Sequence, residues 1–84
     1  VTLMLEGSFY DPALGVLEAG DVEWMAAGLG INHSEGLKAT RWARILQLWI
    51  ALPRAARFGE PQLQMITCDS ARVRREPGVE ARLY

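Results

Sequence analysis

The chain is poor in the side chains that form disulfides and metal sites, with one cysteine, Cys68, and one histidine, His33, among 84 residues. A single cysteine cannot form an internal disulfide, which favours a reducing compartment. The opening residues show no charged leader followed by an apolar core, so no secretion signal is expected. No apolar run approaches the roughly 20 residues that cross a bilayer. We therefore expect a cytoplasmic protein that makes no contact with a membrane.

Charge is distributed unevenly along the chain. Residues 1–35 carry six acidic side chains and no lysine or arginine, whereas residues 36–84 carry nine basic side chains and four acidic ones. A basic surface can attract an acidic partner, but solvated faces of opposite sign explain the same pattern more simply. We expect no direct binding of nucleic acid. A chain of 84 residues forms at most one small domain.

Strand patterns dominate the sequence. The clearest covers Arg44–Leu52, where side chains alternate between two faces until Pro53, which cannot donate to a strand ladder. Gly28 and Gly30 predict a backbone with positive φ or a close approach to a neighbour. Many short strands separated by glycine and proline turns predict an all-β barrel or sandwich. The other predicted elements are strands over Val1–Glu6, Gly15–Glu18, Val22–Ala27, Ile31–Glu35, Gln62–Thr67 and Val79–Tyr84, and one helical turn within residues 54–61.

His33 and Glu35 are the residues with the clearest chemistry. On a strand, residues two apart point to the same side, so the imidazole and the carboxylate project together. A nitrogen and an oxygen donor suit iron, manganese, nickel or zinc. They supply only two of the three or four ligands that a stable site needs, and the chain has no second histidine. Without further context, a structural histidine beside a surface carboxylate explains the pair better.

The residues around this pair change that interpretation. The segment GDVEWMAAGLGINHSE at 20–35, followed by QLWIALP at 47–53, resembles the second cupin motif and next strand of the pirin family. The resemblance covers the chain from its start to about Ile66, and PGVEARLY at 77–84 resembles the passage towards the second domain of that family. It implies an incomplete cupin-type (jelly-roll, double-stranded β-helix) barrel belonging to a bicupin. Residues 1–84 would form a single partial cupin domain, with 67–84 as a linker and last strand.

The resemblance also implies a metal centre. Pirins hold one iron or related metal on three histidines and one glutamate, and His33 and Glu35 match one ligand of each type. The paired histidines of the family precede the strand that VTLMLEG resembles, so we expect half of a metal site, with ligands missing from this chain. Some members are quercetin 2,3-dioxygenases, which cleave a flavonol with molecular oxygen. In that role Glu35 would be both a ligand and a base for the substrate hydroxyl.

Two further residues are candidates for the substrate pocket. Gln47 could point into the barrel beside the metal or lie on the outer face, and the pattern leaves this open. Met25 could line the pocket, although methionine more often fills a core.

The alternative function is a non-catalytic module that binds a transcription factor or a metabolic enzyme, and a remnant without activity is a third interpretation. Because an incomplete barrel exposes strand edges, we also expect self-association.

Overall fold

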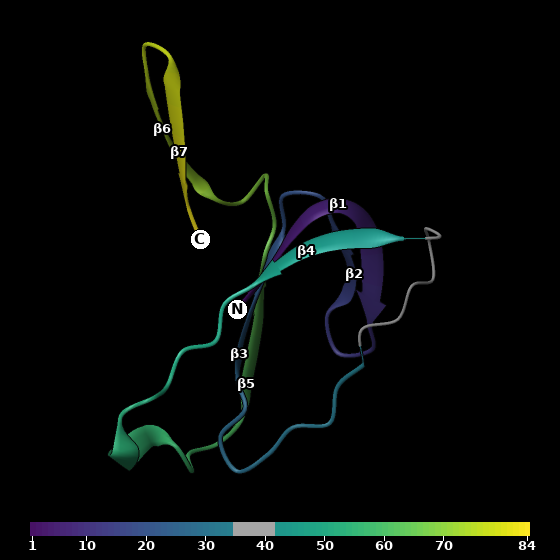
Figure 1. Ribbon diagram of the computed structural model, residues 1–84, viewed down its shortest axis with the longest axis vertical. Helices are drawn as coiled ribbons and strands as arrows, with labels where there is room; N and C mark the ends of the chain where they lie inside the picture. Colours follow the sequence, from purple (N-terminus) through teal and green to yellow (C-terminus); the bar gives the residue numbers. More distant parts are fainter. Residues whose placement is uncertain (35–41) are drawn as a thin grey trace.

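The computed structural model of the chain describes residues 1–34 and 42–84. The described residues are almost entirely strands and connections, which confirms the predicted all-β class (Figure 1). No helix within the described ranges is long and apolar enough to span a membrane. The elements are β1 (Thr2–Asp11), β2 (Gly15–Glu18), β3 (Val22–Ala26), β4 (Ala43–Gln47), a 3-10 turn η1 (Arg54–Ala56), β5 (Gln62–Ile66), β6 (Arg72–Glu76) and β7 (Val79–Leu83).

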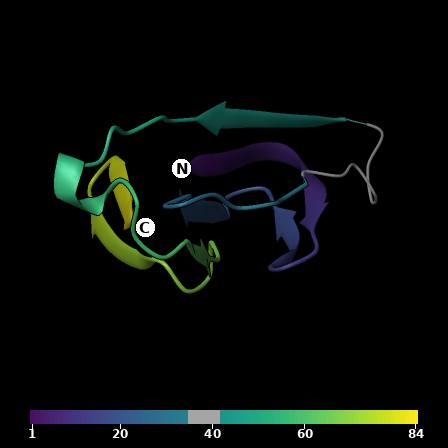
Figure 2. The same ribbon diagram turned by 90° about the horizontal axis from the view of Figure 1, so that it is seen from below.

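One curled sheet contains the first five strands. Its order is β2-β1-β3-β5, and β4 also pairs with β1. The first half of β1 pairs with β3 and β4, and its second half pairs with β2, all antiparallel. The register of β1 against β4 shifts between Met4 and Glu6, and such a bulge bends a strand and increases its twist. The sheet therefore curls into part of a barrel, with β4 and β5 on opposite sides (Figure 2).

The core lies where the two halves of β1 meet. Met4, Phe9 and Leu17 form a buried cluster, and Leu14, Ala43 and Met65 pack against it. The strand predicted over Val1–Glu6 forms the first part of β1, in which Thr2 and Met4 are buried. The bulge at Leu5 then leaves that side chain 40% exposed.

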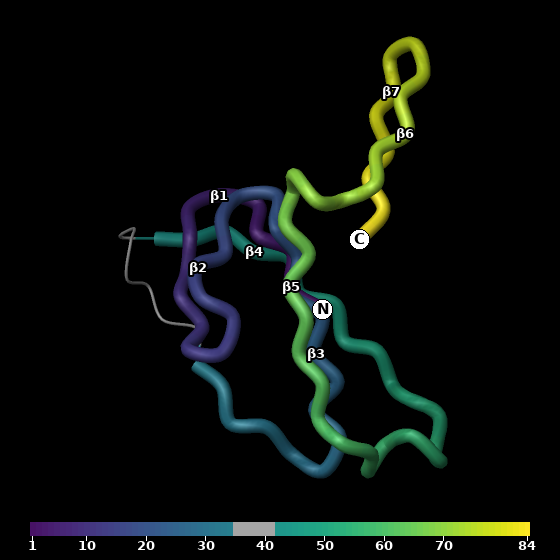
Figure 3. Tube along the Cα trace, turned by 180° about the vertical axis from the view of Figure 1, so that it is seen from behind, coloured from purple at the N-terminus to yellow at the C-terminus, as the bar shows by residue number. Residues whose placement is uncertain are grey.

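A second, two-stranded sheet is formed by β6 and β7. This hairpin turns at Pro77-Gly78 and extends away from the larger sheet (Figures 1 and 3). Its base is anchored by the Tyr84 hydroxyl, which donates a hydrogen bond to the Gly20 carbonyl over 2.6 Å. The Arg82 guanidinium also donates to the Cys68 carbonyl over 2.8 Å. The sequence pattern predicted β7 but not β6, which lies in the segment expected to be a linker.

Two predicted strands differ from the structure. The strand expected over Arg44–Leu52 ends at Gln47, since no strand of the described chain lies beside residues 49–52. Leu48 still exchanges two backbone hydrogen bonds with Val1. The strand expected over Ile31–Glu35 was wrong for Ile31–Ser34, which is irregular. Glu35 itself lies outside the described residues.

Candidate functional site

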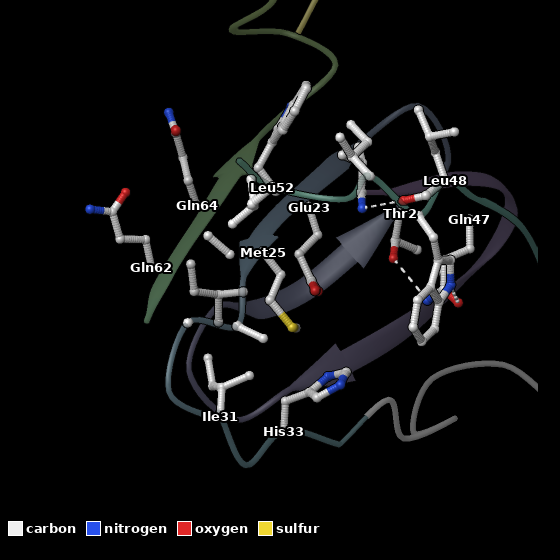
Figure 4. Close-up of a pocket in the computed structure, with 18 of the residues that line it drawn as sticks. Thr2, Glu23, Met25, Ile31, His33, Gln47, Leu48, Leu52, Gln62 and Gln64 are labelled. Carbon is white, nitrogen blue, oxygen red and sulfur yellow. Dashed lines mark hydrogen bonds between the residues drawn. The ribbon is translucent and has the colours of Figure 1, made fainter. Parts of the chain in front are cut away.

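The concave side of the curled sheet holds a cavity of about 860 Å³. Its walls come from the start of β1, from β3 and β5, and from the irregular segments that follow β3 and β4 (Figure 4). Most of its lining is apolar, with polar side chains at separate points, as in many small-molecule sites. The lining residues include Thr2, Glu23, Trp24, Met25, Ile31, His33, Gln47, Leu48, Trp49, Leu52, Arg57 and Leu63.

His33 reaches this cavity from an irregular segment rather than from a strand. The segment leaves β3 through Gly28, whose φ of 51° belongs to the left-handed region that glycine adopts readily. The Leu29 amide donates to the Gly59 carbonyl over 3.1 Å, which ties the segment to the connection between β4 and β5. The His33 ring points into the cavity, although the residue is exposed in this chain (Figure 4).

The predicted pairing of His33 with Glu35 stays a prediction. The pairing was predicted because residues two apart on a strand point to the same side. That reason was wrong for Ile31–Ser34, which do not form a strand. The structure makes no statement about the Glu35 side chain, which lies beyond the described ranges.

Gln47 lines the cavity, and this answers the question that the sequence pattern left open. Its amide nitrogen donates to the Thr2 hydroxyl over 3.3 Å, and its amide oxygen accepts from the Trp49 indole over 3.1 Å. These bonds connect the end of β4 to the start of β1. Gln47 is therefore held on the cavity wall by two side-chain partners.

Met25 also lines the cavity, and beside it is a residue that the sequence pattern did not single out, Glu23. Glu23 and Met25 are two apart on β3, so they share a face of that strand. Glu23 is only 1% exposed, and its carboxylate lies near the Met25 thioether and across from His33 (Figure 4). An acidic residue inside the apolar pattern VEWMA was the available signal for this position.

Two groups near the C-terminus have shifted pKa values. A hydrogen bond from Arg75 holds the pKa of the Glu80 carboxyl below its ordinary value. Burial, with the neighbouring Cys68, raises the pKa of the Tyr84 hydroxyl. Glu80 pairs with Arg75 and Arg82 within the C-terminal hairpin, and Tyr84 bonds its base to Gly20.

The cavity wall provides some of the donor atoms that a metal ion needs, but not a full set. The His33 imidazole is a nitrogen donor that first-row transition metals accept, and Glu23 places carboxylate oxygens on the same wall. Residues 1–34 and 42–84 contain no group of three or more His, Cys, Asp or Glu side chains that could hold an ion. A site with three such ligands therefore needs at least one donor from outside these ranges.

Comparisons with known proteins agree with this architecture. The family model described as Pirin matches residues 1–50 of the chain. The chain belongs to the pirin family. It is 39% identical to Pirin-1 of Arabidopsis thaliana over 87 aligned residues, which cover 99% of the chain and 30% of that protein. It is also 43% identical to Pirin of Rattus norvegicus over 51 residues, or 61% of the chain and 18% of the relative.

A solved structure shows the same fold. The chain matches a crystal structure of a Geobacillus kaustophilus protein with a TM-score of 0.84 and 35% identity, covering 96% of the chain and 34% of that protein. The chain thus spans about a third or less of the length of these relatives. Its curled sheet is an incomplete cupin-type barrel, as the resemblance implied. Cupins of this family typically bind a metal ion.

Proposed function

We propose that the chain contributes to a metal-dependent oxygenase of the quercetin 2,3-dioxygenase type, with a flavonol or a similar enolic phenol as substrate. His33 and Glu35 would hold a single divalent metal, with iron as the first choice and manganese, nickel and zinc as alternatives. Because His33 is the sole histidine of the chain, further histidine ligands would come from additional sequence or a partner subunit.

The observation that carries this proposal is the position of His33. Its imidazole points into a largely apolar cavity whose volume of about 860 Å³ suits a flavonol-sized ligand (Figure 4). Family membership adds the expectation of a metal at this histidine.

Each residue then has a distinct task. His33 would donate a neutral ring nitrogen to the metal, which supplies Lewis acidity and a template when bound. Glu35 would accept the proton of the substrate hydroxyl. Gln47, held by Thr2 and Trp49, would orient the ligand, while Met25 and neighbouring apolar side chains would exclude water.

Oxygen consumption tests the proposal. The chain is supplied with iron and a flavonol, alone and together with the remaining part of a pirin, and compared with His33→Ala and Asn32→Ala. Asn32 is exposed and adjacent to His33 but is not part of the cavity lining, so its replacement is a matched control. Turnover should disappear in His33→Ala and persist in Asn32→Ala. Turnover that survives in His33→Ala would eliminate the proposal.

The alternative, a non-catalytic interaction module, predicts a different result from the same experiment. It expects no flavonol-dependent oxygen consumption in any combination and the same partner binding with or without His33.

A further inference from the structure

Glu23 is a buried carboxylate at the centre of the curled sheet. On β3 it lies opposite Thr2 of β1 and opposite Met65 of β5, so strands flank it on both sides. It is 1% exposed and still lines the cavity, because its side chain extends from the sheet towards the concave side (Figure 4). A ligand that fills the cavity therefore lies against Glu23.

Holding a carboxylate at such a position is costly. A buried charge loses its hydration, and an apolar side chain of similar size would fill a central strand with less penalty. Perturbed or buried ionisable groups on a cavity wall are candidates for function for this reason. Glu23 is separate from the ligand pair His33 and Glu35 that the family resemblance implies.

The chemistry of the surrounding wall indicates what Glu23 recognises. The carboxyl group of Glu23 has two oxygens that can accept hydrogen bonds, so it has capacity for a ligand in addition to any protein partner. Thr2 and Gln47 bond to each other on the neighbouring strands. The remaining wall presents apolar and aromatic surface, including Met25 and Trp49, which suits a planar ring.

We propose that Glu23 determines the ligand specificity of the cavity by accepting a hydrogen bond from a hydroxyl group of a neutral aromatic ligand. The ligand class comes from the proposed function, on which this inference rests. The inference adds Glu23 as the protein group that selects hydroxylated ligands within that class. A hydroxylated ring binds with its hydroxyl at Glu23 and its apolar face on the wall. The same ring with methylated hydroxyls has no proton to donate and places a methyl group against the carboxylate.

The test is equilibrium binding of quercetin and of its fully O-methylated analogue, followed by quenching of tryptophan fluorescence. A chelator is present throughout, so that metal coordination does not contribute. The variants are Glu23→Gln, which removes the charge with little change of shape, and Glu23→Met, which removes the acceptor. Glu18→Gln is the matched control, because Glu18 is an exposed carboxylate on β2 outside the cavity.

The wild-type chain and Glu18→Gln should bind quercetin about tenfold more tightly than the methylated analogue. Glu23→Met should bind the two ligands equally, and Glu23→Gln should lie between. Glu23→Gln keeps the shape of the side chain. If it prefers quercetin over the methylated analogue as strongly as the wild type does, the role of Glu23 is overturned while the proposed function stands. If the wild-type chain binds neither ligand, the ligand class of the proposed function fails, and the inference fails with it.

Discussion

The Gln47 amide donates a hydrogen bond to the Thr2 hydroxyl over 3.3 Å, although 45 residues separate them in the sequence. Thr2 also lies opposite Glu23 in the register of β1 and β3. Three polar side chains from β4, β1 and β3 therefore stand in one row across the concave side of the sheet. This row is the polar part of a cavity that is otherwise largely apolar, and it faces the segment that carries His33.

Replacing Thr2 with valine should destabilise the chain. Thr2 is 3% exposed, and the change removes the acceptor of the Gln47 hydrogen bond while keeping the side-chain shape. We expect a loss of about 1 kcal/mol in the free energy of unfolding, measured by urea denaturation. Thr67→Val is the control, since the hydrogen bond of Thr67 to Ser70 is exposed. Equal losses in the two variants would contradict this role of Thr2.

Gly28→Ala should be more damaging. A Cβ at Gly28 would collide with the Gly59 carbonyl oxygen, and the φ of 51° adds strain for any other residue. We expect a loss of about 2 kcal/mol or more in thermal or urea unfolding. Gly59→Ala is the comparison, because a Cβ there makes only an ordinary contact of 3.6 Å with the Ala56 carbonyl. A tolerated Gly28→Ala would refute the close approach that directs the His33 segment.

Asp11 should act as the acceptor that holds the turn between β1 and β2. Its Oδ1 accepts from the amides of Ala13 and Leu14 over 2.7 and 3.2 Å, and the residue is fully buried. Asp11→Ala should cost about 1–2 kcal/mol of stability. Asp11→Asn keeps an oxygen acceptor and should cost clearly less. Calorimetric melting of the two variants measures the stability that each loses. Equal losses in Asp11→Ala and Asp11→Asn would contradict the role of Asp11 as the acceptor that holds the turn.

The anchor of the C-terminal hairpin should weaken at high pH. Burial and the neighbouring Cys68 raise the pKa of Tyr84 above its ordinary value of 10.0, so the folded chain holds this proton more tightly than the unfolded chain. The contribution of the Tyr84 hydroxyl to the free energy of unfolding is complete below about pH 10, the pKa of the unfolded chain. It is lost as pH rises through the pKa of Tyr84 in the folded chain, because ionised tyrosine cannot donate to the Gly20 carbonyl. Between about pH 8 and 11 the melting temperature of the wild type should therefore fall more steeply than that of Tyr84→Phe, which has no hydroxyl to ionise.

Self-association is expected because sheet edges are open. Within the described ranges, β4 pairs only with β1 and β5 only with β3, so each leaves an edge that can pair with another chain. Apolar side chains near these edges are exposed, among them Leu46 at 60% and Trp49 at 85%. Sedimentation should show dimers or larger species. A monodisperse, well-folded monomer at micromolar concentration would contradict this expectation.

Much of the fold followed from local patterns. Alternation and turn residues predicted strands close to β2, β3 and β5, and the unusual backbone of Gly28 was expected from its place beside Leu29 and Gly30. The strand predicted over Arg44–Leu52 was too long, because a strand also needs a neighbour, and the described chain places none beside residues 49–52. β6 was missed because its residues Arg72–Glu76 are almost all charged, and the ion pairs of Arg74 with Glu76 and of Arg75 with Glu80 form only on the folded hairpin.

The site was predictable only where a motif carried it. His33, Met25 and Gln47 were chosen with the family resemblance in view, and all three lie on the lining of one cavity, although their roles are untested. Glu23 was missed, since its importance depends on the curl of the sheet and on burial, which periodicity does not report. The orientation of Gln47 depended on Thr2, a contact between segments distant in sequence.

Whether His33 is a metal ligand is decided by the metal content of the purified chain after anaerobic supply of iron, manganese, nickel and zinc, with His33→Ala and Asn32→Ala measured in parallel. We predict about one metal ion per chain or per dimer, retained in Asn32→Ala and lost in His33→Ala. A His33→Ala variant that keeps the metal at the same stoichiometry would contradict the assignment of His33 as a metal ligand, and a wild-type chain that binds none would mean that this chain does not complete the site by itself.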